Sequence, residues 1–488
     1  MVVEWWSIIP FAVMLASIAV LPLVPAVEHT WERNSTKLAV ALVLGVPVAI
    51  WFLASGAGSS VVHALVEYFQ FIMLLLALFV VSGGIFLTGD IRATPRNNTI
   101  FLAVGGLIAS FIGTTGAAML LIRPLLNTNR ERKHRVHTVV FTILIVANCG
   151  GLLTPLGDPP LFLGFLRGVP FEWTFNLFPE WLFVNAMLLA TYYGLDRRAY
   201  AREDAAAITL DDTQQTPLGI AGKINFVFFA MVILAVAFVP SIDLHAIEGG
   251  HAAWYQFVPW RELAFATAAA LSFLLGNKEV RFHLNQFTWT PILEVAALFI
   301  GIFLTMMPAL KYLAQVAPSL PLNKITFFVF SGGLSAVLDN APTYVTFFEM
   351  AAQLPGDPRI AANPALGMPG VPEGYLVAIS LGSVFCGAIT YIGNGPNFMT
   401  KAVADAAGVK MPTFGGYVVW TFMYLVPTLV AMVLIFLAEG WLWTVLGVGL
   451  AVGLLARAVW LARSHVHPTE RVDAGADRQA RPRRSPVR

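Results

Sequence analysis

The amino-acid sequence predicts an all-α polytopic membrane protein with about eleven transmembrane helices, two re-entrant hairpins and inverted repeats that contain broken helices. Three observations lead to this fold class. The 488 residues are 57% hydrophobic and 12% charged. The mean hydropathy is +0.73. Soluble domains are far less hydrophobic and more highly charged than this. Polar strings also interrupt four of the apolar segments.

Eleven apolar windows are long enough to cross a bilayer, whose hydrocarbon core of roughly 30 Å needs about 20 apolar residues in a helix. The first window has no positively charged leader and is longer than a signal-peptide core, so it predicts a membrane helix. The windows lie at residues 5–26, 37–55, 65–88, 137–168, 178–195, 223–240, 262–277, 290–310, 374–398, 417–437 and 441–462.

Two further apolar segments, 98–127 and 323–353, predict re-entrant hairpins. The strings "GTTGAA" and "LDNAPT" interrupt their centres and leave arms of about 11 to 16 residues, which are too short to cross. Cytoplasmic loops collect Lys and Arg. Both flanks of the first segment are basic, so it enters from the cytoplasm. The flanks of the second are poor in basic residues, with only Arg359 in the loop 354–373, so it enters from outside.

This arrangement places the N-terminus outside and the C-terminus in the cytoplasm. The basic residues that then fall on the cytoplasmic side are Arg92, Arg96, Arg123, Arg130, Arg132, Lys133, Arg135, Arg197, Arg198, Arg202, Lys278, Arg281, Lys401, Lys410 and the tail from Arg463. Because these residues form short clusters between apolar spans, the net charge of +2 does not indicate a nucleic-acid partner.

The two halves of the chain repeat in order. "GIFLT" occurs at 84–88 and again at 301–305, and each copy precedes a hairpin and an interrupted span. The interruptions read "GGLLTPLGDPPLF" and "GAITYIGNGPNF", which places Asp158 opposite Asn394. Hairpins that open to opposite sides give an inverted topology, which is typical of secondary transporters.

The sequence therefore divides into seven expected parts. These are the N-terminal helices 1–64, repeat 1 at 65–195 with hairpin 98–127 and broken helix 137–168, a cytoplasmic linker 196–222, a connecting helix and outer loop 223–261, repeat 2 at 262–437 with hairpin 323–353 and broken helix 374–398, a C-terminal helix 438–463, and a disordered tail 464–488.

The four polar interruptions predict a binding site at the middle of the membrane. Irregular backbone survives at that depth only if protein buries it or it lines a watered cavity, so the interruptions should face each other. Glycine permits the unwound turn. The string "DPP" places Asp158 at a helix N-cap and Pro159 at the first helical position.

The residue types in these strings suit a small hard cation. Carbonyls, Thr hydroxyls, Asn amides and carboxylates are hard oxygen donors, and no Cys or His pair nearby indicates a soft metal. Neither Asp158 nor Asp339 has a Lys or Arg in its own segment. Since burial penalises the charged form of a carboxylate, each aspartate can accept a proton or bind a cation. This competition is the chemical basis of cation/proton exchange.

Plainer interpretations stand beside this hypothesis. Asp158 and Asp339 can each cap a helix, and capping is compatible with ion binding. Cys149 and Cys386 fit a packing role. Glu294 fits a structural or snorkelling role near a membrane end, and His137 an interfacial one. The aromatic belts at the ends of membrane spans account for Trp5, Trp6, Trp441 and Trp443.

The paired hairpins, "SAVLDNAPTYV", "GDPP" and "GNGPN" resemble the ion transporter superfamily over roughly residues 80–440. The similarity is closest to the NhaD-type sodium/proton antiporters and to the branch named putative citrate transporters (CitMHS-like). It implies a multi-pass secondary transporter of the bacterial inner (plasma) membrane, often a homodimer, which moves its hairpin-bearing part as an elevator. It implies no enzyme activity and no cofactor.

The resemblance also implies that the hairpin tips and broken helices bind sodium and protons, with Asp158 and Asp339 as the proton carriers. The implied site residues are Thr114, Thr115, Thr154, Gly157, Asp158, Asp339, Asn340, Thr343, Thr390, Asn394 and Asn397. Carboxylate-transporting relatives have Ser-Asn-Thr strings in both tips. This chain has "TTG" and "DNAPT", which favours a cation.

Four functions fit the pattern to different degrees. A sodium/proton antiporter fits the acidic tips best. A cation- or proton-coupled citrate or dicarboxylate transporter is the alternative, with helix N-termini holding the small carboxylate. "LGD" is a weak match to the motif of intramembrane aspartyl proteases, because Pro155 replaces its first glycine. A passive channel does not explain inverted repeats with two-sided hairpins.

Overall fold

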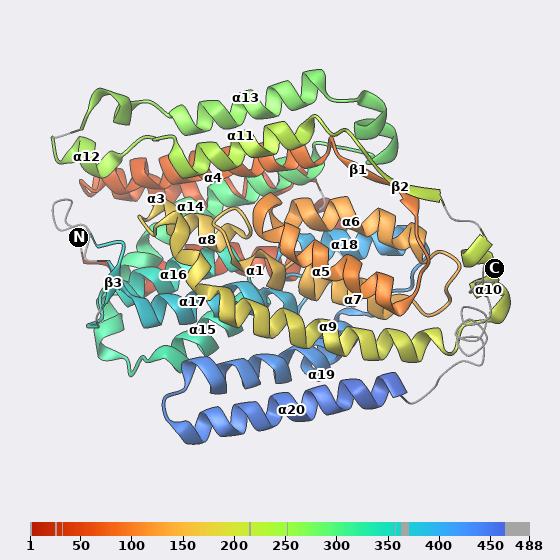
Figure 1. Ribbon diagram of the computed structural model, residues 1–488. Coiled ribbons are helices and arrows are strands. Elements are labelled where there is room, and N and C mark those ends of the chain that lie inside the picture. Colours follow the sequence, from red (N-terminus) through yellow and green to blue (C-terminus); the bar gives the residue numbers. More distant parts are fainter. Residues whose placement is uncertain are drawn as a thin grey trace, which may run out of the picture.

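The computed structural model describes residues 2–24, 27–31, 33–213, 216–250, 252–356, 358–362 and 370–463. Helices dominate the described part and run roughly side by side along one direction (Figure 1). The tail 464–488, expected to be disordered, lies outside the described residues.

Uninterrupted helices form in nine of the eleven predicted windows. Among the described residues, five helical stretches are long and apolar enough to cross a membrane, namely Asn34–Ala54, Gly58–Ser82, Thr290–Ser319, Phe414–Leu437 and Trp441–Arg463. An all-α polytopic membrane protein is therefore confirmed. The nine helices are α1 (Ile9–Val20), α3 (Asn34–Ala54), α4 (Gly58–Ser82), α9 (Phe178–Tyr200), α11 (Asn225–Phe238), α13 (Trp260–Leu275), α14 (Thr290–Val316), α19 (Phe414–Met432) and α20 (Trp441–Arg463).

Two helical hairpins form where the polar strings interrupt apolar segments. The first joins α5 (Pro95–Ile112) to α6 (Thr114–Thr128) at Gly113, whose φ of 83° favours glycine. The second joins α15 (Lys324–Val337) to α16 (Asn340–Ala352). The first hairpin occupies the right half of the bundle in Figure 1 and the second the left half, so they extend from opposite ends.

The other two windows hold the broken spans, each made of a helix, a short turn and a second helix. The first contains α7 (Val136–Ile145), η3 (Cys149–Leu152) and α8 (Pro159–Leu166). The second contains α17 (Glu373–Cys386), η9 (Gly387–Ile389) and α18 (Gly395–Ala406). The break therefore falls at the predicted strings, although α18 continues beyond the expected end at 398.

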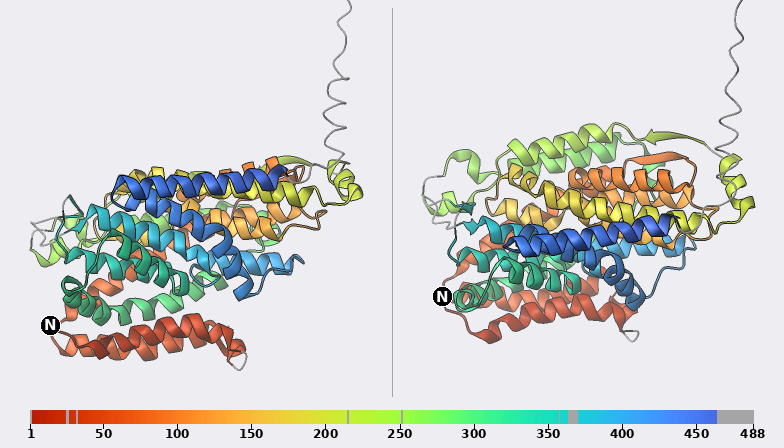
Figure 2. Two further views of the ribbon diagram at one scale, coloured as in Figure 1. Left: turned by 90° about the horizontal axis from the view of Figure 1, so that it is seen from below. Right: turned by 60° about the horizontal axis from the view of Figure 1, so that its bottom comes forward.

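The helices pack as two groups, which we call the frame and the hairpin bundle. The frame contains α1, α3, α4, α11, α13 and α14, with α14 packed against α1, α3 and α4. The hairpin bundle contains α5–α8 and α15–α18, with α9 packed on α5 and α7. Helices α19 and α20 cover α9 on the side opposite the N-terminal helices (Figure 2).

Two small sheets were not predicted. Strand β1 (Phe86–Asp90) pairs antiparallel with β2 (Thr216–Ala221), with Phe86 opposite Ala221, and β3 (Arg359–Ile360) pairs with β4 (Val371–Pro372). The described residues of the linker 196–222 therefore contain the end of α9, a short helix and strand β2. The remaining short elements are η1 (Trp5–Ile8), η2 (Leu21–Leu23), α2 (Glu28–Trp31), η4 (Phe171–Leu177), α10 (Ala205–Thr213), α12 (Leu244–Glu248), η5 (Trp254–Phe257), η6 (Glu279–Leu284), η7 (Ala317–Ser319) and η10 (Val433–Leu437).

The matching pentapeptide "GIFLT" does not mark equivalent parts of the two halves. Its first copy lies in the turn after α4 and in strand β1, whereas its second copy lies inside helix α14. Neighbouring chain decides the conformation of such a short apolar string. The interpretation of the pentapeptide as part of the repeat was therefore wrong, and the resemblance between the halves rests on the hairpins and breaks.

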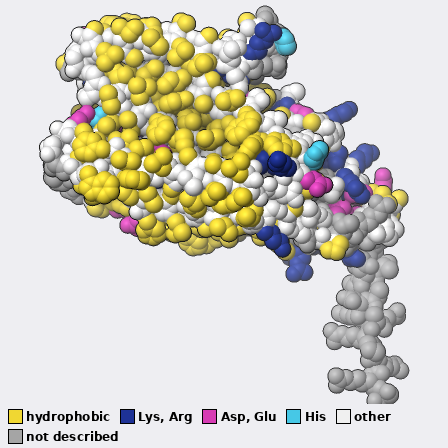
Figure 3. Space-filling view, turned by 90° about the horizontal axis from the view of Figure 1, so that it is seen from above, with side chains coloured by type: hydrophobic (Ala, Val, Ile, Leu, Met, Phe, Trp, Pro, Cys, Tyr) yellow, Lys and Arg dark blue, Asp and Glu magenta, His cyan; other side chains and the backbone are white. Residues whose placement is uncertain are grey.

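The surface separates apolar from charged regions. In Figure 3 hydrophobic side chains cover most of the visible face, while most of the visible Lys, Arg, Asp and Glu side chains gather at the right-hand end, where α20 finishes in Figure 1. Trp5, Trp6, Trp441 and Trp443 are exposed, as expected for aromatic residues at span ends.

Buried ion pairs involve Arg132, which the sequence analysis places on the cytoplasmic side, and His137, which it gives an interfacial role. Arg132 forms two bonds to the Asp196 carboxylate, from Nη2 to Oδ1 at 2.6 Å and from Nη1 to Oδ2 at 3.1 Å. His137 contacts the same carboxylate, with Nε2 at 2.7 Å from Oδ1. All three side chains are buried. His137 therefore has a buried partner on α9 that its own segment does not reveal, and its interfacial position in the membrane stays a prediction.

Arg281 and Glu294 also have structural partners. Arg281 is buried and donates to the carbonyl oxygens of Val80 at 2.5 Å and Ser272 at 2.9 Å. Its charge therefore interacts with the negative ends of helices α4 and α13. Lys37 of α3 lies 2.5 Å from Glu294 of α14, which gives Glu294 the structural role that the sequence favoured.

We expect Asp196→Asn to destabilise the fold strongly. The substitution leaves the buried Arg132 guanidinium with one described ion pair, the longer contact to Glu203 from Nε to Oε1 at 3.6 Å, and breaking a buried ion pair costs about 3–5 kcal/mol. Thermal unfolding of the purified protein in detergent measures the loss. The control is Asp405→Asn, which removes the more exposed pair with Lys401 and should cost less than about 1 kcal/mol. Equal shifts in the two variants would contradict the assignment.

Candidate functional site

One threonine in each break joins that break to the neighbouring hairpin. The Thr154 hydroxyl donates to the Ser110 carbonyl in α5 and accepts from the Leu156 amide at 3.1 Å. In the second half, the Thr390 hydroxyl donates to the Ala336 carbonyl at 2.5 Å and accepts from the Ile392 amide at 3.2 Å. Both predicted site residues therefore satisfy irregular backbone.

Paired glycines allow each break to fold tightly on itself. A Cβ on Gly157 would lie 2.0 Å from the Gly151 carbonyl oxygen, and a Cβ on Gly393 would lie 2.6 Å from the Gly387 carbonyl oxygen. Side chains cannot occupy such positions without moving backbone. The Gly157 carbonyl accepts from the Thr114 amide at 2.8 Å, which joins the first break directly to the first tip.

Asp158 lies where the two tips and the two breaks meet. Its carboxylate accepts from the Thr114 hydroxyl at 3.0 Å, the Asn340 amide at 2.6 Å and the Asn394 amide at 3.2 Å. The side chain is 1% exposed. Among the described contacts, no Lys, Arg or His side chain pairs with it. Three neutral donors from three different segments therefore stabilise this carboxylate.

The two aspartates differ in whether their side chains cap a helix. Asp158 occupies the N-cap position of α8, but its side chain makes no capping bond, since the first two helical residues are Pro159 and Pro160 and lack an N–H. Asp339 does cap α16, because its Oδ1 accepts from the Ala341 amide at 3.0 Å. Asp339 is half-buried, and Thr343 donates to its backbone carbonyl at 3.0 Å.

Asn148 is a site residue that the sequence analysis missed. Its Nδ2 donates to Asn397 Oδ1 at 2.7 Å, and its Oδ1 accepts from Asn394 at 3.2 Å. Asn397 in turn donates to the carbonyls of Gly387 at 2.8 Å and Thr390 at 2.9 Å. This chain of amides orients Asn394 toward Asp158. The sequence feature that could have identified Asn148 is its place as a polar residue in an apolar run, directly before "CGG".

A cavity of about 90 Å³ adjoins Asp158. Its walls are formed by the tip residues Thr114 and Thr115, the first break, the start of α18, and apolar residues of α4 and α14. It is small compared with ligand pockets of roughly 300–1,000 Å³ and has room for a few water molecules. Asp339 is not among the lining residues, so the cavity brings only one of the two aspartates to its wall.

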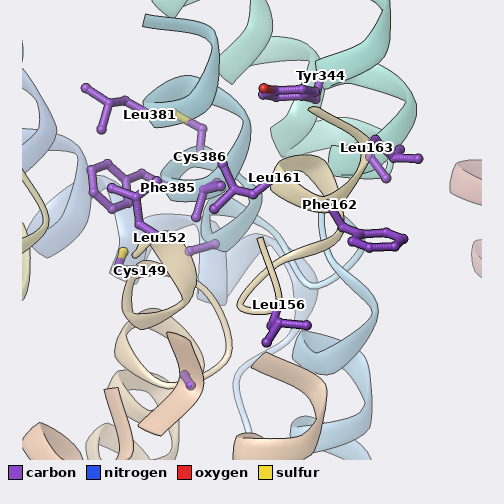
Figure 4. Packing of buried hydrophobic residues seen from close by; sticks show 14 of the residues in the cluster. Cys149, Leu152, Leu156, Leu161, Phe162, Leu163, Tyr344, Leu381, Phe385 and Cys386 are labelled. Carbon is purple, nitrogen blue, oxygen red and sulfur yellow. The ribbon is translucent and has the colours of Figure 1, made fainter. Parts of the chain in front are cut away.

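Apolar packing surrounds the polar centre. In Figure 4 side chains of the first broken span, Cys149, Leu152 and Leu161, lie beside Leu381, Phe385 and Cys386 of the second. Both cysteines are free and buried, in agreement with the packing role that the sequence predicts. These apolar side chains pack around the two breaks.

Four helices begin at this centre. Thr114 starts α6, Pro159 starts α8, Asn340 starts α16 and Gly395 starts α18, so the positive ends of four helix dipoles point toward the Asp158 region. In the described part of the chain, no group of three His, Cys, Asp or Glu residues is placed to hold a metal ion. The available ligands are hydroxyl, amide, carbonyl and carboxylate oxygens, which suit a hard monovalent cation or a proton.

Asn340 adds an unused ligand. The residue is buried, and its Oδ1 has no hydrogen-bond partner, while its Nδ2 donates to Asp158. An unpaired buried carbonyl oxygen costs about 1–3 kcal/mol. A cation beside Asp158 would satisfy it.

In a comparison with protein families, residues 1–437 match the family described as "Putative citrate transport". No curated protein matches the chain significantly. The matched residues contain both hairpins and both broken spans.

We expect Gly157→Ala to disrupt the first break. The added Cβ meets the Gly151 carbonyl at 2.0 Å, so the backbone around Asp158 must shift. A cost above about 2 kcal/mol is expected, in the range of severe packing changes, with a corresponding drop in thermal stability. Gly395→Ala is the matched control, because a Cβ there meets nothing within 4 Å. Similar melting temperatures for the two variants would refute the tight contact.

Proposed function

Because this chain belongs to the family described as "Putative citrate transport", it is a membrane transport protein, and we propose that it is a secondary transporter that exchanges sodium ions for protons. The observation that carries this proposal is the Asp158 carboxylate. It is buried among three neutral donors, without a cationic side chain among its described contacts.

Competition at one carboxylate would couple the two ions. When Asp158 is ionised, a sodium ion balances its charge and takes oxygens from the tips, including the unpartnered Asn340 Oδ1 and the hydroxyls of Thr114 and Thr115. When a proton binds Asp158, the attraction for sodium disappears and the ion leaves. Each site then carries either a proton or sodium, but not both.

The remaining predicted residues have supporting roles in this proposal. Asn394 and Asn397 orient the second break, while Thr154, Gly157 and Thr390 hold the breaks against the hairpin tips. Asp339 is the second proton carrier, and it keeps the α16 N-terminus in place through its cap. Thr343 steadies the same turn.

We further propose that access alternates through movement of the hairpin bundle against the frame, in the manner of an elevator with inverted repeats. Hairpins that extend from opposite ends (Figure 1) support two-sided access to one site. The clustering of charged side chains at the end of the protein where α20 finishes (Figure 3) supports a cytoplasmic location for that end. A bacterial inner membrane and a homodimer complete the proposal.

A cation- or proton-coupled citrate or dicarboxylate transporter is the second candidate. The family description favours it, and so do the four helix N-termini at the site, which attract carboxylates. The size of the cavity, about 90 Å³, favours a small ion instead.

We expect Asp158→Asn to abolish sodium/proton exchange, because an amide cannot titrate. Exchange is measured as the collapse of a pH gradient in proteoliposomes after sodium addition, and we expect at least a hundredfold loss of rate. Asp339→Asn is the comparison, since asparagine also caps helices and Asp339 does not line the cavity beside Asp158. As the second proton carrier it should lose part of the exchange, but less than Asp158→Asn, while the protein stays folded. Sodium-driven exchange that persists in the Asp158→Asn protein would exclude this mechanism.

Uptake of labelled citrate and succinate by the same proteoliposomes separates the two candidates. For an antiporter we expect no uptake of either acid, with or without a sodium gradient, while sodium collapses the pH gradient. Saturable uptake that depends on sodium or on a pH gradient would instead establish carboxylate transport.

A further inference from the structure

Arg167 lies at the far end of the helix that begins at the site. Asp158 is the N-cap of α8 and Arg167 is its C-cap, separated by the eight residues Pro159–Leu166. A helix of this length spans roughly 12 Å and moves as one piece. A displacement of Arg167 therefore accompanies any displacement of Asp158.

The Arg167 guanidinium joins the hairpin bundle to the frame. Its Nη2 lies 2.8 Å from Glu67 Oε2 of α4, which belongs to the frame. Its Nε lies 3.2 Å from Glu349 Oε1 of α16, which belongs to the hairpin bundle. The Arg167 side chain is 9% exposed. One buried cation thus holds one carboxylate on each side of the boundary.

Two cavities adjoin this boundary. Their volumes are about 480 and 550 Å³, and His63, Glu67 and Leu166 line both. Glu67 is 21% exposed and Glu349 is 35% exposed, so water in the cavities reaches both carboxylates. Hydration lowers the cost of separating a buried ion pair, which makes the Glu67 bond one that can open and reform.

We propose that the Arg167–Glu67 ion pair is a latch between the hairpin bundle and the frame, closed in the described conformation and open when the site faces the other side. This inference rests on the proposed alternating-access transport. The Glu349 bond lies within the moving bundle and stays intact throughout the cycle. Of the two described Arg167 ion pairs, the one with Glu67 crosses the boundary and must break.

Cross-linking tests the latch with a matched pair of variants. Glu67→Cys with Arg167→Cys places two thiols across the boundary, and Glu349→Cys with Arg167→Cys places them within the hairpin bundle. A hydrophilic, reducible reagent with two thiol-reactive ends joins each pair in the full-length protein in proteoliposomes. The native Cys149 and Cys386 are buried, and the single substitution Arg167→Cys controls for their reaction.

Linking the boundary pair should reduce transport at least tenfold, with recovery after reduction. Linking the pair within the bundle should retain more than half of the unlinked rate. Undiminished transport by the linked boundary pair, or equal inhibition of the two pairs, would overturn the latch.

Single substitutions provide a second measurement in which Arg167 stays in place. Glu67→Gln should change the maximal rate at least threefold relative to Glu349→Gln, because only the former weakens the boundary. Equal rates would show an ion pair that serves stability alone and would overturn the latch.

The assays measure both sodium/proton exchange and citrate uptake. A wild-type protein that moves citrate but no sodium refutes the antiport proposal, while the cross-linking comparison still tests the latch on citrate uptake. A wild-type protein that exchanges sodium for protons and continues to do so with the boundary pair linked refutes only the latch.

Discussion

The structure depends on the need to satisfy polar backbone where helices stop inside an apolar environment. An unpaired backbone group costs several kcal/mol in hydrocarbon, and four chain segments stop at one place here. They satisfy each other. Thr154 bonds the Ser110 carbonyl, Thr390 bonds the Ala336 carbonyl, and the Gly157 carbonyl accepts from the Thr114 amide. The same interlocking that makes the breaks tolerable also assembles the polar centre.

Asp158 and Asn394 show how a repeated structure produces an asymmetric site. Both are N-cap residues with extended backbone, at φ −140°, ψ 141° and φ −153°, ψ 136°. Both precede a helix with proline at its second position, Pro160 in α8 and Pro396 in α18. One carries a carboxylate and the other an amide, so Asn394 donates to Asp158. Two aspartates at these positions would repel, and two asparagines would leave the centre without charge.

Much of the fold was predictable because apolar length and polar interruption are local signals. The helices, the hairpin turns and the breaks fall at the expected strings, and Asp158 was identified by its charge. Contacts between distant segments were not predictable. Asn148 gains its role from Asn394 and Asn397, Arg132 from Asp196, and β1 from β2, and each partner is remote in sequence. The identical "GIFLT" strings show the converse, since equal letters adopt different structures in different surroundings.

The small sheet formed by β1 and β2 connects the first hairpin to the frame. Strand β1 ends at Asp90 and α5 begins at Pro95, so the connecting chain spans at most roughly 17 Å when fully extended. Its partner β2 leads through a short turn into frame helix α11. A short connection therefore ties the first hairpin to the frame. In the proposed alternating-access cycle, this connection would set the maximum displacement of the hairpin bundle at that end of the protein.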